Sequence, residues 1–118
     1  MSISADELIN DFTPSADDVV EHELPNGKIV LLRKLDTASW AELQRYQALP
    51  NKTEIDVQAY LTFLSAVDSE GNRLFISPDD QARVWGMGPA VNQSISFAVL
   101  AHMGKGPWQA EEEAAKNS

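Results

Sequence analysis

The spacing of apolar residues predicts helices along most of this chain. From Val57 the apolar positions fall at offsets 0, 3, 4, 7 and 10, the stripe of a helix that packs one face against a core. Polar residues that can cap a helix mark the helix starts, and they are Thr37 or Ser39, Thr53, and Ser77, which precedes a proline at the first helical position. The pattern as a whole predicts four helices, over about 38–49, 54–67, 78–86 and 89–103.

One segment near the N-terminus has the pattern of a β-hairpin. β-branched and apolar residues fill 19–24 and 28–35, and Pro25-Asn26-Gly27 separates the two runs. Asn-Gly between extended segments supplies the positive φ angles that a tight hairpin turn demands. A two-stranded hairpin is only marginally stable by itself, so the hairpin over 19–35 is expected to pack against the helices. The sequence therefore predicts one α+β domain, predominantly helical, with an N-terminal β-hairpin.

Both ends of the chain differ from this globular domain, which we place at residues 19–107. Residues 1–18 form an acidic lead in which Ser4 stands three residues before Glu7, the spacing of a capping box, so a short helix over about 5–12 is predicted. Residues 108–118 are a polar tail with helical tendency.

Charge is distributed unevenly along the 118 residues, which carry a formal net charge of -9. Residues 1–23 hold seven acids and no Lys or Arg, which leaves eleven acids against nine bases in the remainder. An acidic surface repels nucleic acid and anionic membranes, so neither is an expected partner. A basic start followed by an apolar run is absent, as is an apolar stretch of about 20 residues, so we expect the protein to stay where it is made.

Residues suited to catalysis or metal binding are few. The chain has no cysteine, which excludes disulfides, thiolate metal sites and cysteine nucleophiles. His22 and His102 have no second ligand at metal-binding spacing. The chain also has neither a phosphate-binding glycine motif nor a serine-nucleophile elbow. We therefore predict no enzyme activity, no metal and no cofactor.

The segment Asp68-Ser69-Glu70-Gly71-Asn72-Arg73 partly matches a calcium-binding loop. Its oxygen-bearing side chains occupy the first, third and fifth positions of that pattern. Arg73, however, stands where the loop requires glycine. A turn with Gly71 in a left-handed conformation is therefore the preferred interpretation.

Four large aromatic or aliphatic residues lie outside the predicted apolar stripes. Phe97 and Leu100 project from other sides of the last helix, Phe63 lies off the stripe of the helix over 54–67, and Trp108 follows the last helix. Exposed apolar patches on a soluble protein usually mark a partner site. We therefore predict that Phe63, Phe97, Leu100 and Trp108 contact a partner.

Several motifs also occur in a distinctive order. An acidic lead comes first, and the hairpin follows as Leu24-Pro25-Asn26-Gly27-Lys28-Ile29-Val30-Leu31-Leu32-Arg33-Lys34-Leu35. Trp40 then lies on a helix, and a second helix leads into Asp68-Ser69-Glu70-Gly71-Asn72-Arg73-Leu74-Phe75. The helix cap at 77–80, a last helix and the closing Lys116-Asn117 complete the order. Over roughly residues 19–118 this order resembles the tail assembly chaperones of long-tailed bacteriophages and prophages.

The resemblance implies a non-enzymatic protein of the bacterial host cytoplasm that is absent from the mature virion. Such proteins bind the long, apolar tape measure protein, keep it soluble and help to recruit tail tube subunits. The family often also makes a longer product by ribosomal frameshifting near the end of the shorter frame. Two alternatives stay open, a small structural protein of tail or head completion and an acidic regulatory or antitoxin-like protein. Formation of a homo-oligomer also stays open.

Overall fold

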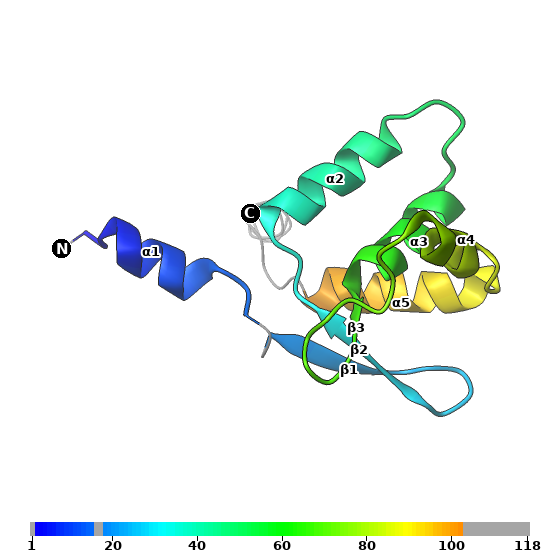
Figure 1. Ribbon diagram of the computed structural model, residues 1–118, viewed down its shortest axis with the longest axis horizontal. Coiled ribbons are helices and arrows are strands. Elements are labelled where there is room, and N and C mark those ends of the chain that lie inside the picture. Colours follow the sequence, from blue (N-terminus) through cyan, green and yellow to red (C-terminus); the bar gives the residue numbers. More distant parts are fainter. Residues whose placement is uncertain (1, 16–17, 103–118) are drawn as a thin grey trace, which may run out of the picture.

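The computed structural model describes residues 2–15 and 18–102 and has the predicted α+β architecture, mostly helical with a β-hairpin near the N-terminus. Helices α2 to α5 gather beside a small antiparallel sheet, whereas α1 extends away from them (Figure 1). The elements in chain order are α1 (Ala5–Phe12), β1 (Val19–Glu23), β2 (Ile29–Arg33), α2 (Thr37–Gln47), α3 (Glu54–Ser65), β3 (Ala66–Val67), α4 (Pro78–Trp85) and α5 (Pro89–His102).

The predicted hairpin forms, but its turn differs from the expected one. Strands β1 and β2 pair antiparallel, and the Leu24 N–H donates to the Lys28 carbonyl at 2.7 Å, so three residues close the loop. Gly27 takes a positive φ of 83°, whereas Asn26 keeps a negative one. Pro25 explains the difference, because its φ of about −65° suits the first central position of a type I turn that ends in a glycine bulge.

Strand β3 is not predicted by the sequence pattern. The apolar stripe predicts a helix over 54–67, but α3 ends at Ser65 and the chain becomes extended at Ala66, with φ −68° and ψ 126°. Ala66 and Val67 then pair with the free edge of β2. The predicted helix end was wrong because the backbone hydrogen bonds are made here with a strand that is distant in the sequence.

Helix α3 lies at the centre of the fold. It packs against α2, α4 and α5, and every residue from 58 to 65 is buried. The predicted one-sided stripe is therefore wrong for this helix, because neighbouring elements cover it on several sides. The larger core side chains are Leu32, Leu35, Leu43, Tyr46, Tyr60, Leu61, Phe63, Leu64, Val84, Ile95 and Val99.

Local capping fixes where most helices begin. Three predicted caps each accept the backbone N–H three residues further on, and they are Ser4, Thr53 and Ser77. Helix α2 begins differently: Asp36 is its cap and accepts from the Ser39 N–H at 2.8 Å, where Thr37 or Ser39 was the predicted cap. The carboxylate of Asp36 is the stronger acceptor at a helix N-terminus. The observed helix bounds lie within two residues of the predicted ones.

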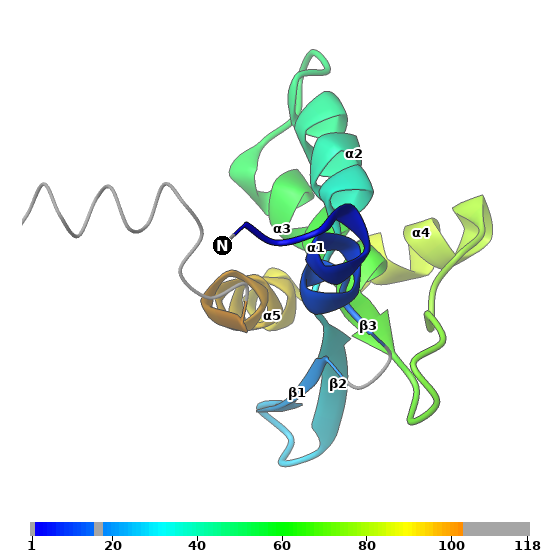
Figure 2. The ribbon, with the colours of Figure 1, turned by 90° about the vertical axis from the view of Figure 1, so that its left-hand side faces the viewer.

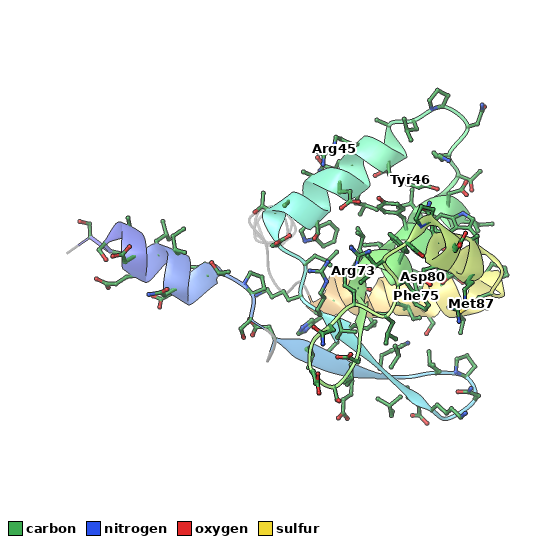
Figure 3. All side chains as sticks on the ribbon, in the orientation of Figure 1. Arg45, Tyr46, Arg73, Phe75, Asp80 and Met87 are labelled. Atoms are coloured by element: carbon green, nitrogen blue, oxygen red, sulfur yellow. The ribbon has the colours of Figure 1, made fainter. Side chains whose placement is uncertain are left out.

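Two arginines from outside α3 bind the carbonyl groups at its C-terminal end. The Arg33 Nε donates to the Leu64 carbonyl at 2.8 Å. The Arg73 guanidinium donates to the Phe63 carbonyl at 3.1 Å and lies over the Phe63 ring. Figure 3 labels Arg73 among the side chains of the fold. Burial lowers the pKa of Arg33, and the nearby charge of Arg73 lowers it further. Because α3 has no basic residue in its own last turn, these two cations complement its dipole.

An aromatic cluster joins α2, α3 and α4. Tyr46 stacks on Tyr60 with ring centroids 4.2 Å apart, and Trp85 meets both rings edge-on. The Trp85 indole N–H donates to Asp56 Oδ1 at 2.9 Å, which ties α4 to the first turn of α3. The backbone N–H of Thr53 and then the Trp85 indole lower the pKa of Asp56 to about 2. Asp56 therefore both caps α3 together with Thr53 and binds Trp85 of α4.

Candidate functional site

A groove runs between α2 and α5, with α3 as its floor. Both helices pack against α3, where Val57 and Leu61 lie one turn apart. A hollow of about 550 Å³ follows α2, another of about 460 Å³ follows α5, and both are lined by Val57, Leu61 and Leu100. This continuous surface, the α2–α3–α5 groove, is defined by Trp40, Leu43, Gln44, Gln47, Val57, Leu61, Phe97 and Leu100.

Helix α2 forms one wall of the groove. Trp40, Gln44 and Gln47 line it at spacings of four and three residues, which places them along one helical face. The neighbouring face of α2 buries Leu43 and Tyr46 in the core. Because the core anchors the helix, its groove-facing side chains stay partly open to solvent.

Helix α5 forms the opposite wall. It buries Ile95 and Val99 in the core, as its apolar stripe predicts. Phe97 and Leu100 lie off that buried face and are 60% and 39% exposed. Both line the part of the groove that follows α5, so the structure brings together two of the predicted partner residues.

The groove offers apolar surface rather than charge. Among the described residues, the hollow along α2 is lined by no charged side chain. Lys52 and Glu54 stand together in the part that follows α5 and oppose one another in sign. The Lys52 ammonium lies 4.7 Å from the centre of the Tyr46 ring. Burial of apolar area is therefore the main contribution that this site can make to binding.

The other two predicted partner residues are not in the groove. Phe63 is 6% exposed and packs in the core between Tyr60 and the Arg73 guanidinium. The prediction that Phe63 contacts a partner was therefore wrong, because α3 is covered on the side that the stripe left open. Trp108 lies outside the described residues.

The two histidines make contacts between elements. His22 Nε2 lies 2.8 Å from Ser94 Oγ and links β1 to α5. His102 Nε2 lies 3.3 Å from the Asp18 carbonyl. Within residues 2–15 and 18–102, no three His, Asp or Glu side chains are grouped so that they could hold a metal ion. The histidines thus have structural contacts in the described fold.

The segment that partly matches a calcium loop is a hydrogen-bonded turn. The Asp68 carboxylate accepts the backbone N–H groups of Glu70 and Asn72 at 2.9 and 3.0 Å. Gly71 has a φ of 85°, which confirms the predicted left-handed glycine. One carboxylate oxygen of Asp68, Oδ1, thus accepts both hydrogen bonds and holds the turn.

Comparison with known proteins finds no match among family models, curated proteins or solved structures, so the functional argument rests on the geometry of the groove. In the part of the chain that the structure describes, no helix has both the length and the apolar character needed to cross a bilayer.

Sequence reasoning missed the floor and one wall of the groove. Val57 and Leu61 belong to the stripe that was predicted to face the core, and Leu61 is indeed buried at the base of the site. The sequence could not show that α2 and α5 leave a gap above α3, because that gap depends on how three helices pack.

Proposed function

We propose that this protein is a phage tail assembly chaperone that holds apolar helical segments of the tape measure protein in the α2–α3–α5 groove. The observation that carries the proposal is the continuous apolar groove, with the exposed Phe97 and Leu100 on one wall and the half-buried Trp40 on the other. Helix-in-groove recognition uses such a surface, because a partner helix inserts apolar side chains that recur every three or four residues.

The size of the groove suits about two turns of a partner helix. From Trp40 to Gln47 the wall extends over seven helical steps of 1.5 Å each, a length of about 10 Å. A contact of this length is weak by itself. Several copies that bind along one long partner gain affinity through multivalency, provided that the partner repeats the apolar pattern.

The charge distribution supports the same proposal. The acidic lead keeps the unbound protein soluble, while the groove itself is nearly neutral. In this function the protein acts without catalysis in the cytoplasm of the bacterial host, helps to recruit tail tube subunits and leaves before the virion is complete. The resemblance of the motif order to tail assembly chaperones provides the identity of the partner.

Co-expression with the tape measure gene of the same phage or prophage tests the proposal. The tape measure protein is expressed with the wild-type chain, with the Phe97→Asp variant and alone, and its soluble yield is compared. Ile76→Asp is the matched control, because Ile76 is 68% exposed and lies outside the groove. We expect the wild type and the control to raise the soluble yield and Phe97→Asp to raise it much less.

Salt separates the apolar mechanism from an electrostatic one. Interactions between exposed charges are screened beyond about 8 Å at physiological ionic strength and more strongly at higher salt. Apolar binding should therefore persist in lysates at high salt. No gain in solubility with the wild-type chain would contradict the chaperone function, and a gain that disappears at high salt would contradict the groove as its basis.

A further inference from the structure

Helix α1 exposes an apolar face that its own chain leaves open. All eight of its residues are exposed, and Leu8, Ile9 and Phe12 share one side of the helix at 48%, 64% and 74% exposure. Asp6 and Asp11 are also exposed. Figure 2 looks almost along α1 and shows it in front of the other helices. The helix is therefore amphipathic and its apolar side has no buried contact.

An eight-residue helix needs such a contact to be stable. Isolated helices shorter than about 12 residues are marginal in water even with good sequences. Helix α1 is well capped, because Ser4 Oγ accepts the Glu7 N–H and donates to the Glu7 carboxylate. A cap contributes only about 1 kcal/mol. Lasting helix formation here therefore requires that another surface cover Leu8, Ile9 and Phe12.

Hydrogen bonds on both sides of the connection between α1 and β1 hold these two elements together. Thr13 Oγ1 donates to the Ile9 carbonyl and ends the helix. Ser15 and Asp18 then hydrogen bond to each other through a side chain and through the backbone, at 2.9 and 3.0 Å. The Lys34 N–H donates to the Asp18 carbonyl and fixes this connection to β2.

The apolar face of α1 adjoins the α2–α3–α5 groove. Leu8, Ile9 and Phe12 line a hollow of about 530 Å³ whose other side is the start of α2, including Trp40. Trp40 also lines the groove, so one apolar surface runs from α1 across α2 to Leu100. A surface that carries both a protruding apolar helix and an apolar groove can be complementary to itself about a two-fold axis.

We infer that a second copy of this chain covers this surface, with α1 of each copy docked in the α2–α3–α5 groove of the other. The inference goes beyond the proposed function, since it concerns the protein before any partner is bound. It accounts for two features together, an amphipathic helix without a buried contact and an apolar groove without an occupant. The dimer keeps both covered until a partner helix replaces α1.

The exposed apolar area comes close to the lower limit of what a stable dimer needs. An aromatic side chain buries about 200 Å², and with that value as an upper limit for leucine and isoleucine the exposed parts of Leu8, Ile9 and Phe12 amount to roughly 370 Å² per copy. Phe97 and Leu100 add roughly 200 Å² on the same scale. Two copies thus bring together roughly 1,100 Å² from five side chains each, and specific dimers bury about 1,200–2,000 Å² in total. Trp40 and the glutamines of α2 supply the remainder.

Sedimentation equilibrium of the full chain tests the dimer. We expect the wild type to be dimeric at a concentration of about 100 μM, a range in which weak specific dimers form. Phe12→Asp should weaken the association at least tenfold and leave the monomer folded by circular dichroism, because Phe12 is 74% exposed within its own chain. Ile76→Asp, the matched exposed control, should leave the dimer intact. A monomeric wild type, or a dimer that Phe12→Asp leaves unchanged, would overturn the inference.

A mixing experiment distinguishes docking on a second copy from docking on the same chain. Phe12→Asp spoils α1 and leaves the groove intact, whereas Leu100→Asp spoils the groove and leaves α1 intact. Each variant alone lacks both intact contacts and should be monomeric, while an equimolar mixture regains one contact and should associate. If the mixture stays monomeric while the wild type is dimeric, α1 does not dock in the groove of the other copy. The experiment uses no tape measure protein, so its failure leaves the proposed function standing.

Discussion

Replacement of Phe97 by aspartate separates a binding role of the groove from a structural one. Full burial of a phenylalanine side chain is worth about 1.5–3 kcal/mol. Phe97 keeps 60% of its surface exposed, so the fold gains about 1 kcal/mol from the buried remainder. The free energy of unfolding should therefore fall by no more than that amount, which lowers Tm by about 4–8 °C in a domain of this size.

The exposed part of Phe97 is what a partner helix can cover. That part is worth about 1–2 kcal/mol on the same scale, and aspartate would in addition have to lose its water in an apolar contact. We therefore expect Phe97→Asp to weaken binding to helical segments of the tape measure protein by about tenfold or more. Isothermal titration calorimetry with such segments measures the dissociation constant, and urea unfolding measures the stability of the same sample.

Phe63 provides the contrasting case. Because it is 6% exposed, Phe63→Ala should lower the free energy of unfolding by about 3–5 kcal/mol, as large-to-small changes in a core do. The binding interpretation of Phe97 would be refuted if Phe97→Asp lowered stability as much as Phe63→Ala does. An unchanged dissociation constant would also refute it. Ile76→Asp should change neither quantity, since it removes apolar surface of similar exposure outside the groove.

Two further predictions concern the ends of α3. Arg33→Met should lower the free energy of unfolding by about 1.5–3 kcal/mol in urea titrations, because it removes charged hydrogen bonds to Leu64 and Ser39; Arg45→Met, at an exposed position on α2, should change it by less than about 0.5 kcal/mol. The pKa of Asp56 is about 2 in the fold, so its stabilising effect is present above its unfolded pKa of 3.8 and is lost as pH falls toward 2. Urea midpoints between pH 5 and pH 2 should therefore fall less for Asp56→Asn than for the wild type.

Local chemistry let the sequence predict the helix starts. Ser4, Thr53 and Ser77 are correct because a cap and its target N–H lie three residues apart, so no other part of the chain decides the contact. The same holds for Gly71, where one glycine is needed for the positive φ of a turn. At the start of α2, by contrast, Thr37 or Ser39 was the predicted cap, because the prediction did not take account of the stronger acceptor just before them, the Asp36 carboxylate.

Contacts between distant elements set the limit of sequence reasoning. Phe63 and Phe97 look alike in the sequence, since each is an aromatic residue off the main stripe of a helix. Their environments differ because α3 lies between other helices while α5 lies at the surface. β3 was missed for the same reason, since Ala66 and Val67 leave the helix only because β2 offers an open edge.

The acidic lead limits how tightly the inferred dimer can hold. Docking of α1 brings Asp6, Glu7 and Asp11 of each copy to the other, and each copy has a net charge of -9. Repulsion between two such chains weakens the apolar contact, and it weakens it less at high salt, where the charges are screened. A tape measure helix without this acidic excess does not meet the same repulsion in the groove. The charge of the lead thus favours exchange of α1 for the partner, because it penalises the contact between two copies more than the contact with an uncharged apolar helix.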